Sequence, residues 1–308
     1  MSARFALLPA EGLLHISGPD TIRFLHSQAS ADLRLVTEGQ AVYGTFCTPQ
    51  GRVFCDFLAI QIAADHVALR MRNSIIDHAI SALSRFAMFS KVSLQREQDG
   101  WQVVGCWGDG ARDALTGLLD TVPGTSLGCA RQENTVLIQT DATGQQFEYL
   151  LREPRSAEQL EPGLIATPAS AWEAEQVRCG LARIEAATIG EFLPEQLNYD
   201  LTGHINFRKG CYPGQEVIAR MHYKGKAKRR MILARLPEGE IPVAGSPVYN
   251  RGRDQPVGNI VNAGITVDDD RLALVSCTRR AIDEGLQLAP DAATVLQQED
   301  LPYPVELN

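Results

Sequence analysis

Apolar positions in the first half of the chain follow the strand period in some segments and the helix period in others. Residues 42–48 and 52–62 predict two strands joined by the turn Pro49-Gln50-Gly51. Six apolar residues within 74–88 recur at helical spacing: Ile75, Ile76, Ala79, Ile80, Leu83 and Phe86. Further strands are expected at 92–94, 101–107, 136–140 and 148–152. Pairs of strands separated by single helices predict α+β lobes with antiparallel sheets, not a doubly wound parallel sheet.

Beyond Arg230 the pattern changes to short apolar runs separated by turn sequences. The runs occupy 231–236, 248–249, 257–261 and 272–275, with Pro, Gly and Asp clusters between them. Short strands at such spacing are typical of a small all-β barrel. We therefore expect two α+β lobes within residues 1–230 and a C-terminal β-barrel domain over 231–308.

Composition places the chain among globular proteins. It has 308 residues, of which 44% are apolar and 21% charged. No run of about 18 uncharged apolar residues occurs, and the apolar part of the N-terminus is too short for a secretory signal. We expect a cytoplasmic protein with no membrane contact. The glycine-rich loops of Rossmann and P-loop nucleotide sites are not found in the sequence.

Charge is distributed unevenly along the chain. The net charge is -8, yet residues 206–230 hold eight basic residues and one acidic residue, Glu216. Such a segment attracts phosphates, a polyglutamate tail, RNA or an acidic partner. A solvated positive strip is an equally good interpretation of its later part, from Lys224 to Arg230.

The most unusual stretch, 209–220, reads Lys-Gly-Cys-Tyr-Pro-Gly-Gln-Glu-Val-Ile-Ala-Arg. Pro213 suits the first turn of a helix, because its missing N–H would be unpaired there in any case. Cys211 then precedes that helix, where the helix dipole and Lys209 both favour the thiolate. A buried, inert thiol is the alternative. The other six cysteines show no metal-site spacing and predict free thiols, most of them filling the core.

Neighbouring residues of this stretch are suited to hold a ligand. Gly210 and Gly214 allow the backbone to approach a ligand closely, and Tyr212 offers an aromatic face. Gln215 and Glu216 are expected in the first helical turn. There Glu216 has a second interpretation, as a charge that complements the helix dipole.

Residues 209–216 resemble the KGCYxGQE signature of the YgfZ-type folate-binding proteins, which are relatives of the glycine-cleavage T-protein. Five further stretches match that family in the same order: 15–33, 46–52, 86–92, 192–198 and 301–303. The resemblance therefore covers nearly the whole chain. It implies two α+β lobes and a C-terminal β-barrel arranged as a ring, with tetrahydrofolate or a derivative in a central channel.

The resemblance also implies which residues contact folate. Trp172 matches a family tryptophan associated with folate, and an indole is suited to stack on a flat pterin; the alternative is a residue that packs a helix onto its lobe. The other implied contacts are Asn198, Gly210, Tyr212, Gly214, Gln215, Glu216 and Arg220. The family's second folate-associated tryptophan has no match near the first strand.

Three residues are candidates for chemistry: Cys211, Lys209 and Asp56. The T-protein family uses an acidic pair after its hairpin glycines, whereas this chain offers only Asp56 there. The resemblance thus favours the role linked to YgfZ-type proteins, a folate-dependent accessory function in iron–sulfur cluster assembly or repair that supports enzymes such as those modifying tRNA. Its expected partners are reduced folate and iron–sulfur assembly factors or client enzymes.

Two other functions remain as alternatives. One is a folate-dependent aminomethyltransferase of the glycine-cleavage type. The other, ranked last, is direct RNA binding, which we do not expect because the rest of the chain is acidic and the basic run has few aromatic residues. No resident metal is expected, because one signature cysteine cannot supply the four protein ligands of a cluster.

Overall fold

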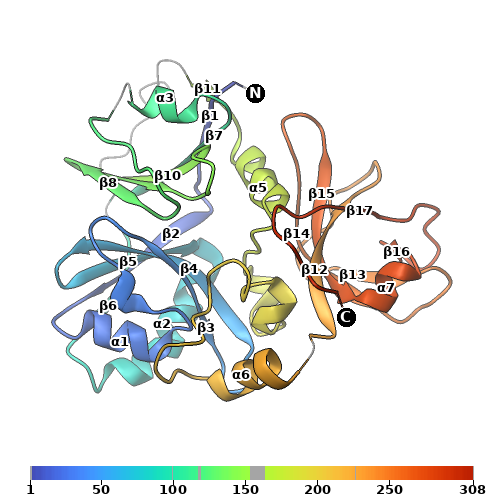
Figure 1. The fold of residues 1–308 in the computed structure, drawn as a ribbon, viewed down its shortest axis with the longest axis horizontal. Helices are drawn as coiled ribbons and strands as arrows, with labels where there is room; N and C mark the ends of the chain where they lie inside the picture. Colours follow the sequence, from blue (N-terminus) through green and yellow to red (C-terminus); the bar gives the residue numbers. More distant parts are fainter. Residues whose placement is uncertain (1, 99, 117–118, 153–163, 226, 308) are drawn as a thin grey trace. The chain divides into compact units, whose positions relative to one another are not determined.

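A computed structural model describes residues 2–98, 100–116, 119–152, 164–225 and 227–307 (Figure 1). The chain divides into two compact units. The first comprises Met1–Gly44 and Phe57–Trp172, and the second comprises Thr45–Asp56 and Glu173–Asn308. The tip of the hairpin predicted around residue 50 therefore belongs to the second unit, although its strands continue into the first.

The first unit contains two sheets. One has the strand order β3-β4-β5-β2-β6. Its strands are β2 (Glu11–Ser17), β3 (Val42–Cys47), β4 (Val53–Ala63), β5 (His66–Arg72) and β6 (Ser93–Arg96), accompanied by helices α1 (Thr21–Gln28) and α2 (Ile76–Ala87). Helix α2 buries Ile76, Ala79 and Leu83, which confirms the amphipathic helix predicted over 74–88; a 3₁₀ turn, Asn73–Ile75, forms its entry.

The second sheet of this unit has the order β11-β1-β7-β10-β9-β8. Its members are β1 (Arg4–Leu7), β7 (Gln102–Trp107), β8 (Cys129–Gln132), β9 (Thr135–Gln139), β10 (Gln146–Leu151) and β11 (Ile165–Ala166), with α3 (Ala111–Thr116) beside them. Every recorded pairing is antiparallel except that of β1 with the two-residue β11. The predicted α+β lobes with antiparallel sheets are confirmed.

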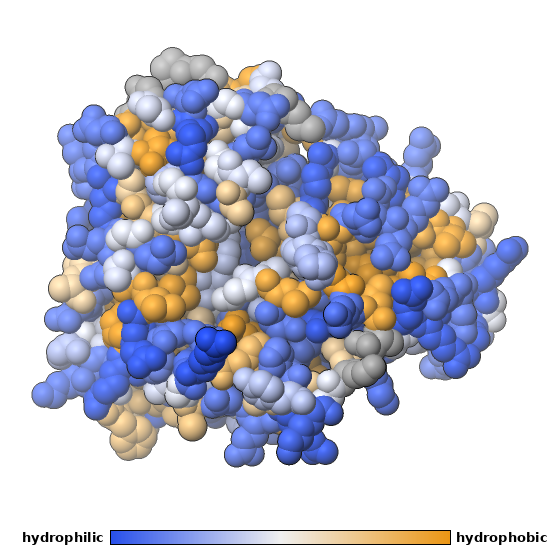
Figure 2. Space-filling model, in the orientation of Figure 1, coloured by the Kyte–Doolittle hydropathy of each residue, from blue (hydrophilic) through white to orange (hydrophobic). Residues whose placement is uncertain are grey.

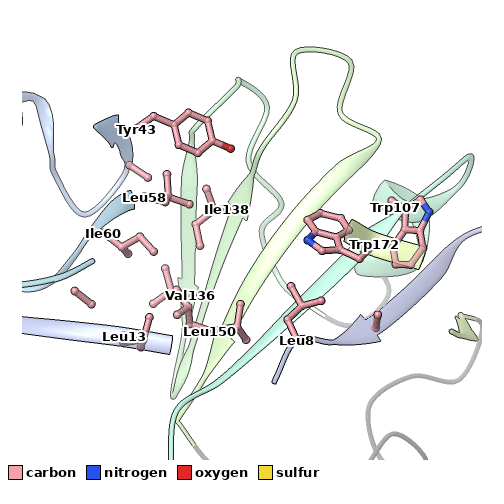
Figure 3. Close-up of a cluster of buried hydrophobic side chains, with 14 of the residues drawn as sticks. Leu8, Leu13, Tyr43, Leu58, Ile60, Trp107, Val136, Ile138, Leu150 and Trp172 are labelled. Carbon is pink, nitrogen blue, oxygen red and sulfur yellow. The ribbon is translucent and has the colours of Figure 1, made fainter. Parts of the chain in front are cut away.

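Side-chain alternation along β7 divides the core of the first unit. Val103 and Trp107 join one apolar cluster, whereas Val104 and Cys106 point into another. The first cluster brings Leu13, Leu58 and Ile60 of one sheet against side chains of the other, as Figure 3 shows: Val136, Ile138 and Leu150. Burial between two sheets explains why these strands are apolar on the faces that meet.

The second unit contains α5 (Ala169–Arg178, whose first turn lies in the first unit), α6 (Gln215–Lys224) and a six-stranded sheet of order β16-β13-β14-β15-β12-β17. The strands are β12 (Arg229–Arg235), β13 (Pro247–Asn250), β14 (Gly258–Ile265), β15 (Arg271–Thr278), β16 (Leu286–Gln287) and β17 (Gln297–Glu299), and α7 (Arg279–Asp283) follows β15. This curled antiparallel sheet is the half-barrel form of the predicted barrel, and an apolar cluster that includes Ile232, Ile260 and Val275 fills it. The domain boundary predicted near Arg230 falls at the start of β12 and stays a prediction.

The surface agrees with the composition. The face shown in Figure 2 is covered largely by hydrophilic residues, with apolar residues in separate patches. Within the described residues, no helix has the length and apolar character needed to cross a bilayer.

Candidate functional site

The signature loop, which we define as residues 209–214, is seated on the tip of the β3–β4 hairpin. Gly214 caps α6 with φ +82°, a left-handed conformation that favours glycine. A Cβ atom at Gly214 would lie 2.5 Å from the Thr48 carbonyl oxygen and 2.8 Å from Gly51 Cα. Only a glycine therefore allows the loop to approach the hairpin this closely.

The helix start differs from the sequence prediction by two residues. Helix α6 begins at Gln215, with Gly214 as its N-cap, so Pro213 precedes the helix and is not part of its first turn. The left-handed glycine, and not the proline, directs the chain into the helix. Gln215 and Glu216 lie in the first turn as predicted, with Gln215 half-buried and Glu216 exposed.

Cys211 is the exposed cysteine of the chain. Cys47, Cys55, Cys106 and Cys277 are buried free thiols, while Cys129 and Cys179 are half-buried. Burial raises the pKa of both Cys47 and Cys277 to about 12, which keeps those thiols protonated and inert. Exposure thus separates Cys211 from the cysteines of the core, and its reactivity stays a prediction.

Lys209 and Tyr212 pack against each other inside the signature loop. The Lys209 ammonium nitrogen lies 4.8 Å from the centroid of the Tyr212 ring, a cation–π contact. Both side chains are buried, with Lys209 only 6% exposed, and burial raises the pKa of the Tyr212 hydroxyl. One face of the Tyr212 ring is therefore covered by Lys209, and Lys209 itself is buried. A role for either residue in ligand binding or chemistry stays a prediction.

Asp56, the one acid left from the family's acidic pair, is held by the protein itself. It is 2% exposed; one carboxylate oxygen accepts a hydrogen bond from Arg183 Nε at 2.7 Å, and the other accepts one from the Ile184 N–H at 2.7 Å. A charge-paired carboxylate with both oxygens engaged is stable in the core without a ligand.

Trp172 packs inside the first unit. It is 2% exposed, its ring lies at 5.5 Å from the Trp107 ring in an edge-on arrangement, and a Cβ at Gly105 would approach it to 2.5 Å (Figure 3). Gly105 therefore makes room for the indole. These contacts are those of the packing alternative, and stacking on a pterin stays a prediction.

Asn198 connects the segment before the signature to the C-terminal sheet. It follows the 3₁₀ turn Pro194–Leu197 in a left-handed conformation with φ +56°. Its Nδ2 donates to the Met231 carbonyl at 2.8 Å, and its Oδ1 accepts from the Met231 N–H at 3.3 Å. Both polar atoms of this predicted folate contact are thus used in holding β12.

A pocket of about 740 Å³ lies beside α6 within the second unit. Arg220, predicted to contact a ligand, lines it. So do three further cations of the basic segment, Lys224, Lys228 and Arg229, while Lys226 lies outside the described residues. Leu193, Val217 and Met221 form its apolar wall. Of the other predicted ligand contacts in and after the signature loop, Gly210, Cys211, Gln215 and Glu216 are not among the described residues that line this pocket.

Glu195 also lines this pocket and was missed by sequence reasoning. Its side chain is buried, 3% exposed, and neither carboxylate oxygen has a hydrogen-bond partner among the described residues. Burial raises the pKa of this carboxyl from 4.5 to about 7, and the nearby Asp200 adds to the effect. The signal in the sequence was an acid directly after the apolar stretch Phe192-Leu193-Pro194.

Comparison with known proteins identifies the family. The model of the GCVT N-terminal domain matches residues 10–132. The tRNA-modifying protein YgfZ of Photorhabdus laumondii is 30% identical over 237 residues, which cover 76% of this chain and 71% of that protein. The chain belongs to the YgfZ family. YgfZ proteins of Yersinia pseudotuberculosis and Klebsiella pneumoniae are 26% and 27% identical and cover 94% and 96% of the chain.

Membership in the YgfZ family agrees with the structural comparison. Aminomethyltransferase T of the glycine cleavage system from Bartonella henselae superposes with a TM-score of 0.70 at 14% identity, covering 90% of this chain and 78% of that one. At this identity the likeness shows the fold. Together with the match to the GCVT N-terminal domain, it confirms the relationship to the T-protein that the signature predicted.

Proposed function

We propose that this member of the YgfZ family is a folate-binding accessory protein for iron–sulfur enzymes, among them enzymes that modify tRNA. Three curated relatives carry the name tRNA-modifying protein, which supports the tRNA link. The observation that carries the proposal is the exposed Cys211 in a signature loop whose backbone is held in place by the hairpin tip.

Cys211 has the accessibility that a reacting or ligating thiol needs. As a thiolate it would act as a nucleophile or donate one sulfur ligand to iron. One sulfur is too few for a cluster that takes four protein ligands. Any cluster handled here would therefore be shared with a partner protein, as cargo in transit.

The fit of this chain to folate is uneven. The Trp172 ring packs against Trp107, and the side-chain amide of Asn198 is hydrogen-bonded to Met231. One face of the Tyr212 ring is covered by Lys209. Arg220 is the predicted contact that lines a pocket, and the unpartnered Glu195 beside it is a ready acceptor for a buried N–H. Folate binding is proposed from the family relationship, and we assign no chemical step to it.

Aminomethyl transfer is the less favoured function. A carboxylate that takes part in the reaction must reach the substrate, yet Asp56 is buried in its pair with Arg183. We expect no turnover with glycine-cleavage partners. Turnover that disappears in Asp56→Asn would promote this alternative.

Complementation tests the role of Cys211. Cells lacking the wild-type protein would be given either Cys211→Ser or Cys129→Ser, the latter changing a half-buried thiol whose pKa burial raises to about 11. We expect Cys211→Ser to fold and yet fail to restore the activity of an iron–sulfur tRNA-modifying enzyme, and Cys129→Ser to restore it. Full restoration by Cys211→Ser would refute the proposed role.

Titration with reduced folate tests the ligand. Direct stacking of the pterin on Trp172 predicts quenching of its fluorescence and a loss of affinity of about tenfold in Trp172→Phe, which retains an apolar ring. Equal affinity in the two proteins would leave Trp172 as a packing residue.

A further inference from the structure

Three titratable side chains meet in the first unit, on strands that lie next to each other. His15 is on β2, His66 begins β5 and Glu97 directly follows β6, and β2 lies between the other two strands. His15 Nε2 lies 2.5 Å from a Glu97 carboxylate oxygen, and His15 Nδ1 lies 2.8 Å from His66 Nε2. The three side chains therefore form one continuous row of close polar contacts.

The Glu97 carboxylate at one end of this row decides which nitrogen of each histidine donates and which accepts. A carboxylate only accepts, so His15 must carry its proton on Nε2 and donate to Glu97. In a neutral imidazole the other nitrogen then has a lone pair, so His15 Nδ1 accepts from His66 Nε2–H. The remaining nitrogen, His66 Nδ1, is left as a hydrogen-bond acceptor, and the negative charge of Glu97 at the other end of the row strengthens it as an acceptor.

Neutral rings are consistent with the burial of both histidines. Burial lowers the pKa of His15 even though Glu97 opposes the shift. Burial also lowers the pKa of His66, to which the neighbouring His15 contributes. Both rings are accordingly uncharged at neutral pH, as the order of donors requires.

These three side chains lie at a pocket of about 790 Å³ in the first unit. His15, His66 and Glu97 all line it, together with Trp101, Arg96 and Arg152. Arg96 is paired with Asp77 at 3.0 Å, whereas Arg152 is exposed. Trp101 is half-buried and thus has part of its ring accessible. The lining therefore offers a hydrogen-bond acceptor, His66 Nδ1, together with an aromatic surface, Trp101, and a cationic group, Arg152.

We propose that this pocket is a ligand site for a nucleoside monophosphate, built from residues outside the signature loop. His66 Nδ1 accepts an N–H of the base, Trp101 stacks on the base, and Arg152 meets the phosphate. Glu97 and His15 are positioning residues that hold His66 in the accepting tautomer. The site stands independently of the folate and iron–sulfur proposals, because it uses none of their residues.

Fluorescence offers a direct binding assay. The chain has three tryptophans, of which Trp107 and Trp172 are 3% and 2% exposed, so quenching by a ligand bound in this pocket reports Trp101. We would titrate the full-length protein with the four nucleoside 5′-monophosphates, with guanosine and with inorganic phosphate. We expect at least one monophosphate to bind with a Kd of about 1 mM or lower, and guanosine or inorganic phosphate alone to bind about tenfold more weakly. No quenching by any monophosphate would overturn the proposal.

Variants assign the groups. His66→Gln and Arg152→Gln should each weaken the monophosphate about tenfold, and Glu97→Gln, which keeps a hydrogen-bond acceptor without its charge, about threefold. His78→Gln, on the exposed face of α2, is the control and should bind as the wild type does. Unchanged affinity in His66→Gln would contradict the assignment.

Imidazole nitrogen chemical shifts of the wild-type protein test the order of donors without any mutation. We expect His66 to carry its proton on Nε2 and His15 to carry its proton on Nε2 as well. Protonation of His66 on Nδ1 at neutral pH would refute this order of donors even if a monophosphate binds.

Discussion

Single residues of this chain are distinguished by their exposure more than by their sequence neighbours. Cys211 is exposed, whereas Cys106 and Cys277 are buried. The apolar neighbours of the buried cysteines were visible in the sequence, but the exposure of Cys211 depends on how its loop sits on the hairpin.

Alkylation measures that difference. With a mild reagent at neutral pH we expect Cys211 to be modified at least about tenfold faster than Cys106 or Cys277, because the thiolate must form and be reached. Mass mapping of partly modified protein gives the order. Equal rates for the three cysteines would show that the signature loop confers no special reactivity.

Glu195 predicts a dependence of stability on pH. Its pKa is raised from 4.5 to about 7 in the folded protein, so the folded state holds a proton that the unfolded state has lost between these values. The free energy of unfolding therefore falls as pH rises from about 4.5 to 7, by up to about 3 kcal/mol.

Glu195→Gln removes this titration. We would measure the free energy of unfolding of both proteins in urea at pH 5 and at pH 8. The value for the variant minus the value for the wild type should be about 2 kcal/mol larger at pH 8 than at pH 5. The cost of burying the amide is the same at both pH values and cancels. Parallel pH profiles for the two proteins would show that Glu195 finds a partner for its charge.

At the scale of elements, the signature loop, α6 and the hairpin tip depend on one another. Gly214 provides the left-handed cap of α6 and the close approach to Thr48. Val217 of α6 lies against Gly51 at the hairpin tip, where a Cβ would be 3.1 Å from it. Cap and contact together position the exposed Cys211.

Two glycine variants separate these effects. Gly203 has φ +80° with nothing within 4 Å of its Cβ position, so Gly203→Ala should cost only the left-handed backbone, about 1 kcal/mol. Gly214→Ala should cost that plus the clash with backbone at the hairpin tip, about 3 kcal/mol in total, measured by urea unfolding. Equal losses would show that the tip moves aside without cost.

At the scale of the whole molecule, the charge of residues 206–230 contrasts with a net charge of -8. Arg208, unlike Lys209, is exposed and free to meet an anion in solution. Four other cations of this segment, Arg220, Lys224, Lys228 and Arg229, gather at one pocket. A binding role for these cations stays a prediction.

Salt dependence tests whether this charge serves ligand binding. Arg208→Gln should weaken a polyglutamyl folate about threefold while leaving the monoglutamyl form nearly unchanged, and the difference should shrink when salt shortens the range of the interaction from about 10 Å at 0.1 M to about 3 Å at 1 M. Equal effects on both forms would exclude a contact with the acidic tail. Salt-dependent tRNA binding that Lys224→Gln weakens would favour the RNA alternative.

The sequence by itself determined the elements and the family. Strands β3, β4, β6, β7, β9 and β10, helix α2 and the run of short C-terminal strands follow from the spacing of apolar residues, because strand and helix geometry repeat locally along the chain. Strands β1, β5, β8 and β11 were not predicted. The signature 209–216 identified the family because its glycines and cysteine stand in an order that random turns do not reproduce.

Tertiary structure alone decided which of these residues are exposed or unpartnered and so able to contact a ligand. Lys209, Trp172 and Asn198 proved to be packed or paired, Glu195 proved to be buried without a partner, and His15 met His66 and Glu97 across three strands. Each outcome depends on residues far away in the sequence. Exposure, pKa and hydrogen-bond partners are properties of the folded neighbourhood, and local spacing cannot encode which distant side chains will fill it.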